Sequence, residues 1–130
     1  GATAMHDVTR GGLLETLLEI ALLSNVGIQV AYNDIPIPPV VSRFVDEFQF
    51  DPLKMISSGT LVAAVDPLHL DDAQQALGKA GIPFADIGEI VPVKGVRVIM
   101  DSQTIHYQEI QAEEDELARL WTYYTPDKED

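Results

Sequence analysis

Two adjacent glycines, Gly11 and Gly12, stand at the start of the most regular apolar stretch in the sequence. Apolar residues follow with helical spacing at Leu13, Leu14, Leu17, Leu18, Ala21 and Leu22. Because this spacing places them on one face, it predicts an amphipathic helix from residue 11 to about residue 25. Glu15 and Glu19 are expected on the opposite face, in water. Two carboxylates four residues apart can also hold a divalent ion, but a solvated face is the commoner arrangement.

The residues before this helix form a candidate anion-binding loop. Backbone N–H groups in the first turn of a helix have no partner within the helix, and they attract anions. Gly11 and Gly12 lack the Cβ atoms that would block a close approach. A plainer interpretation makes Thr9 only an N-cap and the glycines only a tight turn. The residues by themselves leave both interpretations open.

Helices and strands alternate along the rest of the chain. Strands are expected at residues 28–32, 60–65, 84–91, 96–101 and 104–110, with hairpin turns at 94–95 and 102–103. Helices are expected at residues 39–48, 70–80 and 113–123. A further short helix is expected directly after Asp51, which would be its N-cap. Gly27 is expected to close the first helix in the left-handed conformation. The run 60–65 is almost continuously apolar, which predicts a central strand covered on both faces.

In these later helices, the side chains expected to face the core of the domain are Val40, Val41, Phe44, Val45, Phe48, Ala73, Ala76, Leu77, Ala80, Leu117, Leu120 and Trp121. The order of elements predicts an α/β (α+β) fold, with one mixed sheet of four or five strands and helices packed on it. One domain is expected over residues 1–125. Residues 126–130 are expected to form a disordered acidic tail.

The charge and the absence of cysteine exclude several classes of function. Eight basic residues against 21 acidic ones give a net charge of −13, which disfavours binding to nucleic acid and to anionic membranes. No apolar run approaches the roughly twenty residues that span a bilayer, so a cytoplasmic protein is expected. Without cysteine the chain has no disulfide, thiolate nucleophile or Cys-ligated zinc site.

Other candidate chemistry is sparse. His6, His69 and His106 lack the spacing of metal ligands, so no metal site is predicted. His6 adjoins Asp7 and the glycines, where an imidazole can act as an acid, a base or a phosphate donor. A histidine at a strand edge that is hydrogen-bonded to backbone is the plainer interpretation. The turn at residues 57–59 either faces a cleft or simply turns in solvent.

Three segments carry a resemblance to a known family: Met5 to Leu14, Ile35-Pro36-Ile37-Pro38, and Asp51 to Leu61. They resemble the C-terminal domain of the PurM-like (AIR synthase-related) superfamily, and within it the HypE group of hydrogenase maturation factors. The likeness runs from about Met5 to about Val91. It includes Ile87-Gly88-Glu89-Ile90, whose glycine predicts a bulge or a close backbone approach. The resemblance implies a layered α/β domain that is partly like the ferredoxin fold.

The resemblance also implies a function for the candidate loops, because members of this superfamily use ATP. The residues that would face the phosphates or the substrate are Asp7, Thr9, Arg10, Gly11 and Gly12, with His6, Ser57, Ser58 and Gly59 as further candidates. Arg10 would counter negative charge, and the glycine amides would donate hydrogen bonds. No single catalytic residue is assigned.

By the same resemblance, an N-terminal ATP-binding domain absent from this chain would supply the Mg-binding carboxylates, most ATP contacts and much of a homodimer interface. The chain is therefore expected to be one half of a longer ATP-dependent enzyme, able to fold but not to catalyse alone. A maturation factor is a further expected partner. The resemblance also implies a reactive terminal cysteine, which this chain does not hold. The alternative is a non-catalytic regulatory or assembly module that keeps the fold.

Overall fold

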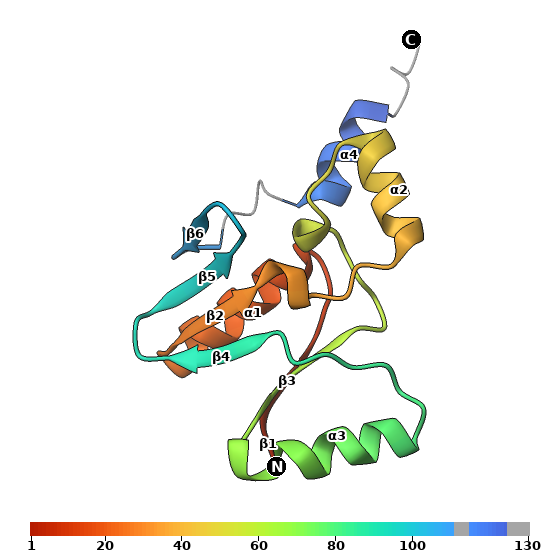
Figure 1. Ribbon diagram of the computed structural model, residues 1–130. Coiled ribbons are helices and arrows are strands. Elements are labelled where there is room, and N and C mark those ends of the chain that lie inside the picture. The colour runs from red at the N-terminus through yellow and green to blue at the C-terminus, as the bar shows by residue number, and fades with distance from the viewer. Residues whose placement is uncertain (111–114, 125–130) are drawn as a thin grey trace.

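A computed structural model of the chain describes residues 1–110 and 115–124 (Figure 1). The α-helices are α1 (Gly12–Ser24), α2 (Pro39–Phe48), α3 (Leu70–Lys79) and α4 (Glu116–Tyr124). The strands are β1 (Ala2–Asp7), β2 (Gly27–Ala31), β3 (Leu61–Val65), β4 (Gly88–Val91), β5 (Gly95–Ile99) and β6 (Thr104–Tyr107). Short 3-10 helices η1, η2 and η3 lie at Tyr32–Asp34, Pro52–Lys54 and Pro67–His69. The predicted mixed α/β class is confirmed.

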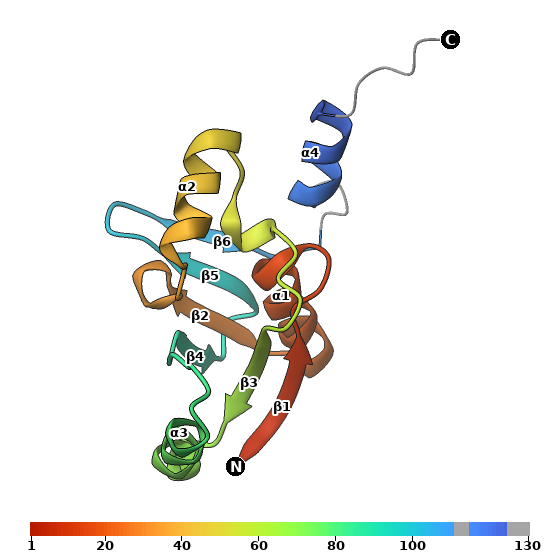
Figure 2. The same ribbon diagram turned by 90° about the vertical axis from the view of Figure 1, so that its right-hand side faces the viewer.

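A four-stranded mixed sheet forms the centre of the molecule, in the order β4-β2-β5-β6. Strand β2 runs parallel to β5, and the other two pairs are antiparallel. Helix α1 packs on one face, as Figures 1 and 2 show. The buried core consists of Leu14, Leu17, Leu18, Ile20, Ala21, Ile28, Val30, Ile35, Leu53, Val96 and Val98. The predicted packing of the first helix on a sheet is therefore confirmed.

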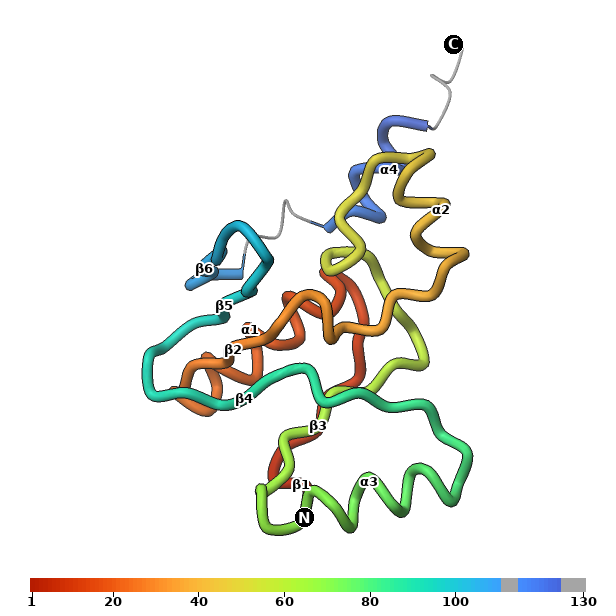
Figure 3. The backbone as a smooth tube through the Cα atoms, in the orientation of Figure 1, coloured from red at the N-terminus to blue at the C-terminus, as the bar shows by residue number. Residues whose placement is uncertain are grey.

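The remaining strands, β1 and β3, form a separate antiparallel ribbon in which His6 faces Val62 and Asp7 faces Leu61 (Figure 3). The prediction of a central, doubly covered strand at residues 60–65 is wrong. Leu61 and Ala63 are exposed, and β1 is the only strand paired with β3 among the described residues. An apolar run reports hydrophobicity but does not specify which strand will pair with it.

Both ends of α1 differ in detail from the prediction. The residue that caps its start is Gly11, at φ 74°, and not Thr9. The residue that ends it is Asn25, which takes the left-handed conformation at φ 56° and donates to the carbonyls of Ala21 and Leu22. Asparagine tolerates this conformation almost as well as glycine does. Gly27 instead begins β2, where a Cβ atom would collide with the backbone of Val93.

Helices α2, α3 and α4 lie at the periphery, with α2 and α4 at the top of Figure 1 and α3 at the bottom. The prediction that their apolar faces are buried in the core is wrong, because none of the three holds a buried residue. Phe44 is 51% exposed and Trp121 is 73% exposed. Aromatic contacts instead join α2 to α4, where Phe48 meets the Tyr124 ring edge-on at 5.6 Å. These helices are amphipathic, but no layer of the described chain covers them.

One of the two predicted hairpins is present. Strands β5 and β6 pair directly across the turn at Met100 to Gln103, as expected. Strands β4 and β5 do not pair, because β2 lies between them. Gly88 confirms the expected close approach, since a Cβ atom there would lie 2.8 Å from the Cα atom of Val30. Asp51 caps η2 as predicted, accepting from the Leu53 amide at 2.9 Å.

Two predictions fall outside the described part of the chain, namely the first residues of the helix expected from residue 113 and the acidic tail at 126–130. Within the described ranges, no helix is both long enough and apolar enough to cross a bilayer.

Candidate functional site

The two candidate loops lie next to each other at one end of the β1–β3 ribbon. The Val8 amide donates to the carbonyl of Thr60 at 2.9 Å, which joins the glycine loop to the 57–60 turn. Val8 is 1% exposed, so this junction is anchored in the core. The predicted site segments are 45 residues or more apart in sequence. They are brought together because β1 and β3 pair up to their ends.

Within the glycine loop, defined as residues 9–12, the polar side chains are exposed and the glycines are buried. Thr9 and Arg10 reach solvent, whereas Gly11 and Gly12 are covered. The Gly12 amide donates to the Thr9 carbonyl at 3.2 Å, which closes a tight turn. No side chain caps the start of α1. The loop therefore presents the Thr9 hydroxyl and the Arg10 guanidinium to solvent at the start of α1.

Both glycines are required by the backbone. Gly11 and Gly12 have φ values of 74° and 70°, in the left-handed region that L residues rarely adopt. A Cβ atom on Gly12 would lie 2.5 Å from the carbonyl oxygen of Leu53 and 2.7 Å from that of Met55. A Cβ atom on Gly11 would collide with the carboxylate of Glu15. Because Gly12 has no Cβ atom, η2 can pack closely against the start of α1. Because Gly11 has none, the Glu15 carboxylate can lie over the loop.

The Arg10 side chain holds the start of α4. Its Nε donates to Oδ2 of Asp115 at 3.0 Å, and Asp115 is only 6% exposed. The other oxygen, Oδ1, accepts from the Leu117 amide at 3.0 Å and so caps α4. Asp115 was not among the predicted site residues. Asp115 could have been recognised as an N-cap, because it lies two residues before Leu117, the first apolar residue of the helix. It was missed because the helix was expected to start at residue 113.

His6 connects the ribbon to α1. Its Nε2 lies 2.8 Å from Oε2 of Glu19, and its Nδ1 lies 2.7 Å from the backbone oxygen of Asp7. The expectation that Glu19 faces water is therefore wrong, since it makes an ion pair with His6 when the imidazole is protonated. The plainer interpretation of His6, a strand histidine bonded to backbone, agrees with this geometry. The Asp7 side chain is 76% exposed.

The 57–60 turn is closed by its own hydrogen bonds. The Thr60 amide donates to the Ser57 carbonyl at 3.1 Å, and the two side-chain hydroxyls lie 2.8 Å apart. Ser58 and Gly59 are exposed at its tip, with Gly59 at φ 93°. A Cβ atom on Gly59 would meet nothing within 4 Å. The tip of the turn is therefore free of neighbours in the described chain.

The carboxylates around the loop repel one another. Burial raises the pKa of Glu15 above its ordinary value of 4.5, the charges of Glu19 and Asp115 raise it further, and Arg10 partly offsets them. No group of three or more acidic or histidine side chains in the described ranges is arranged to hold a metal ion. The site thus has excess negative charge around a single guanidinium.

Glu15→Gln is expected to stabilise the chain near neutral pH. A raised pKa means that the folded state binds the proton more tightly than the unfolded chain does, so this contribution is fully present below pH 4.5 and is lost as pH rises through the raised pKa. The amide imitates the protonated form. Its melting temperature should exceed the wild-type value by a few degrees at pH 7, and the difference should shrink toward pH 4. An advantage independent of pH would contradict this assignment.

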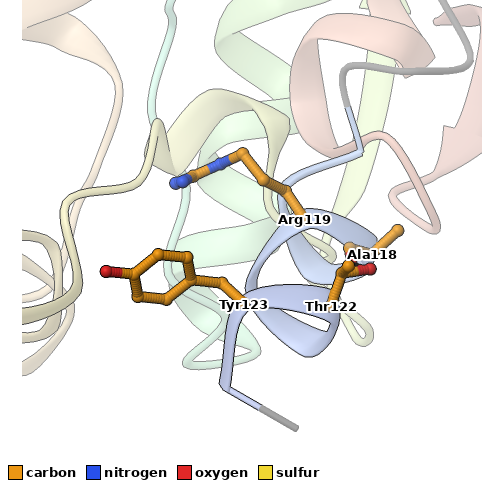
Figure 4. Close-up of a pocket in the computed structure, with 4 residues that line it drawn as sticks. All are labelled: Ala118, Arg119, Thr122 and Tyr123. Carbon is orange, nitrogen blue, oxygen red and sulfur yellow. Dashed lines mark hydrogen bonds between the residues drawn. The ribbon is translucent and has the colours of Figure 1, made fainter. Parts of the chain in front are cut away.

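An open depression on α4 is a weaker candidate site. It is lined by Ala118, Arg119, Thr122 and Tyr123, which Figure 4 shows along one helix. The Arg119 guanidinium already donates to the Gln49 carbonyl at 2.8 Å and to the Glu116 carboxylate. These bonds fix α4 against the segment after α2. The depression therefore lacks the converging free polar groups found at the glycine loop.

Comparison with known proteins places this geometry in context. The family model described as AIR synthase related protein, C-terminal domain, matches residues 1–101. The chain is 40% identical over 93 residues to the carbamoyl dehydratase HypE of Bradyrhizobium diazoefficiens, covering 70% of the chain and 27% of that protein. It is 33% identical over 100 residues to the carbamoyl dehydratase HypE of Escherichia coli K12, covering 75% and 30%.

Solved structures give the same picture. The crystal structure of E. coli HypE, a hydrogenase maturation protein, superimposes with a TM-score of 0.78 at 30% identity, covering 92% of this chain and 38% of that one. A HypE structure in complex with ATP superimposes with a TM-score of 0.76 at 23% identity, covering 85% and 36%, and this likeness concerns the fold alone. The chain thus spans less than two fifths of the proteins it matches.

Proposed function

Since this chain belongs to the family of AIR synthase related proteins and matches their C-terminal domain, we propose that its glycine loop forms one wall of a phosphate- or substrate-binding site that another domain completes. The domain would extend over residues 1–125. The groups that face the ligand would be Asp7, Thr9, Arg10, Gly11 and Gly12, with Ser57, Ser58 and Gly59 on the neighbouring turn. His6 would hold the loop in place.

The observation that carries this proposal is the junction of the two loops. The bond from the Val8 amide to the Thr60 carbonyl aligns the start of α1 with the exposed tip of the 57–60 turn. The tip of the turn at Gly59 has no side chain in front of it, whereas the Glu15 carboxylate lies over Gly11 in the glycine loop. Helix-start amides and a guanidinium are the donors that bind phosphate oxygens in proteins. The site opens outward from this chain, which fits a surface completed by a second domain.

For the whole protein we propose a HypE-like, ATP-dependent role in hydrogenase maturation. The support is the 40% identity to a protein named carbamoyl dehydratase HypE. The surroundings of Arg10 are acidic, so ATP would need the charge of Mg²⁺ or of basic groups on the N-terminal domain. That domain would also carry the homodimer contacts, and a maturation factor would be a further partner. A cytoplasmic location remains a prediction.

Binding of phosphate at the loop requires Arg10 to exchange partners. In the present arrangement its Nε donates to Asp115, although the guanidinium is 76% exposed and keeps further N–H groups toward solvent. A bound phosphate would recruit those outward donors and the amides of the first turn of α1. The negative charge of Glu15 over Gly11 would oppose this until it is screened or protonated.

Calorimetric titration of Mg-ATP into the full-length protein tests the proposal. The Thr9→Ala, Arg10→Ala double variant is expected to bind at least tens of fold more weakly than wild type, because it loses a charge-assisted donor. Arg43→Ala, on the exposed face of α2, is the matched control and should bind normally. The isolated chain should show no binding. Undiminished binding by the double variant would contradict a role for the glycine loop.

A second candidate function is a non-catalytic regulatory or assembly module. It is favoured by one observation, that carboxylates of the chain already occupy the loop: Asp115 on Arg10 and Glu15 over Gly11. On this view the loop is a structural joint between β1, α1 and α4. A folded full-length protein that binds no Mg-ATP would support the module and overturn the enzyme.

A further inference from the structure

Helix α4 is held beside the glycine loop by polar contacts rather than by a buried apolar face (Figure 2). Glu116 and Leu120 are half-buried, and the other residues of α4 are exposed. The ring contact of Tyr124 is with Phe48 of another peripheral helix, α2. Elements that bury little apolar surface open at a low cost in free energy. Helix α4 can therefore leave the domain while the core around α1 stays folded.

One of these polar contacts occupies the cation of the glycine loop. Asp115, directly before α4, is the one charged side chain that is buried within residues 1–110 and 115–124. Its Oδ2 accepts from Nε of Arg10 at 3.0 Å. A buried carboxylate that loses its cation is left with an uncompensated charge. If Arg10 turns to another anion, Asp115 must therefore move into water, and the start of α4 moves with it.

The contact between Arg10 and Asp115 is weak enough to be exchanged. The Arg10 side chain is 76% exposed, so water and salt screen the pair. A phosphate group carries more negative charge than a carboxylate and can accept from two N–H groups of one guanidinium. Burial and the charges of Glu19 and Asp115 raise the pKa of Glu15 above its ordinary value. The departure of Asp115 would thus also relieve repulsion between carboxylates at the loop.

Two further contacts join α4 to the segment that supports the loop from its other side. Oε1 of Glu116 accepts from the Asp51 amide at 3.0 Å. The Asp51 side chain in turn caps η2, whose carbonyl groups lie against Gly12. One turn later in α4, Arg119 donates to the Gln49 carbonyl at 2.8 Å. The docked position of α4 is therefore coupled to both sides of the glycine loop.

We propose that α4 is an autoinhibitory helix. In its docked position Asp115 occupies Arg10, and a phosphate group that binds at the glycine loop takes over Arg10 and releases α4. This inference rests on the phosphate site proposed above and adds its regulation. The matching family model ends at residue 101, so it includes neither Asp115 nor α4. By linkage, a change that releases α4 raises the affinity for the phosphate group, and binding of the phosphate group releases α4.

Calorimetric titration of the full-length protein with Mg-ATP and, separately, with inorganic phosphate measures this coupling. Asp115→Asn removes the charge that binds Arg10 but keeps an oxygen that can accept from the Leu117 amide, so α4 still has its cap. It is expected to bind at least about fivefold more tightly than wild type, as is typical of coupled sites. Asp72→Asn, at an exposed position of α3, is the matched control and should bind like wild type. Tighter binding of Mg-ATP alone identifies a nucleotide as the source of the phosphate group, and tighter binding of both probes identifies a site for free phosphate.

Arg119→Ala separates the release of α4 from a simple change of charge. Electrostatics alone predicts that losing a cation weakens the binding of an anion. Release of α4 predicts the opposite, a binding about twofold tighter or more, because loss of the bond to the Gln49 carbonyl weakens docking without touching Arg10 or Asp115. Arg43→Ala makes the same charge change at an exposed residue of α2 and should bind like wild type.

Amide hydrogen exchange of the same proteins gives a second readout. Mg-ATP is expected to speed exchange in residues 116–124 of wild type, and in Asp115→Asn these amides should exchange faster without any ligand. Unchanged protection of β2 and β5 shows that each variant is folded. Slower exchange of α4 with Mg-ATP overturns the autoinhibitory helix and leaves the phosphate site in place. So does binding by Asp115→Asn or Arg119→Ala that is no tighter than that of wild type. If neither wild type nor Asp115→Asn binds either probe, the phosphate site itself fails, and this inference fails with it.

Discussion

Gly12→Ala is expected to destabilise the chain by about 3 kcal/mol, a large part of the roughly 5–15 kcal/mol that holds a domain folded. An L residue at φ 70° costs about 1 kcal/mol or more. The added Cβ atom must also sit 2.5 Å and 2.7 Å from the carbonyl oxygens of Leu53 and Met55. These are backbone atoms of a segment held by the Asp51 cap, so the clash can be relieved only by separating η2 from α1.

Urea denaturation measures this effect, and the chain offers a matched control. Gly59 has the same sign of φ, at 93°, but a Cβ atom there meets nothing within 4 Å. Gly59→Ala should therefore cost only the conformational term of about 1 kcal/mol. Equal losses from Gly12→Ala and Gly59→Ala would show that the contact between η2 and the helix start is not a tight one.

Gly88→Ala is expected to cost about 2–3 kcal/mol by pushing β4 away from β2. Its φ is not in the left-handed region, so the cost comes from contact rather than from conformation. A Cβ atom would collide with the carbonyl oxygen of Gln29 and would lie 2.8 Å from the Cα atom of Val30. Overpacking that forces backbone shifts usually costs 1–3 kcal/mol, and here it also strains four residue pairs.

The position of the damage distinguishes this effect from a general loss of stability. Amide hydrogen exchange should increase along β4 and the β2 edge that faces it, while β5 and β6 stay protected. Gly78→Ala in α3 is the control, because a Cβ atom there meets nothing within 4 Å and alanine favours the helix by about 0.5–1 kcal/mol. Unchanged exchange at β4 in Gly88→Ala would contradict the close approach.

Local signals in the sequence predicted local structure well. The period of the leucines predicted α1, Asp51 and Pro52 predicted the start of η2, and the glycine in the Ile87 to Ile90 segment predicted a close backbone approach. Each of these depends on interactions within a few residues or on a backbone constraint that a single residue type meets. The glycine loop was found for the same reason.

Local sequence signals could not predict which side chains bind to Arg10 and His6 at the candidate site. The bond from Arg10 to Asp115 joins residues 105 positions apart, and the ion pair of His6 with Glu19 joins a strand to a helix. Neither residue type nor spacing specifies such a pair, because hydrogen-bonding groups on the surface have many possible partners. The predicted exposure of Glu19 was wrong because the course of β1 beside α1 was not known.

The sequence by itself determined approximately where the helices and the strands β2 to β6 form, that Gly11 and Gly12 open a helix, and that the chain belongs among the AIR synthase related proteins. It did not predict the strand β1. Only the tertiary structure decided that β3 pairs with β1 in a separate ribbon, and that α2 and α4 leave their aromatic faces outside the core. The physical reason is that hydrophobic periodicity sets which face of an element avoids water, whereas the choice of neighbour depends on strand register and close packing between distant segments.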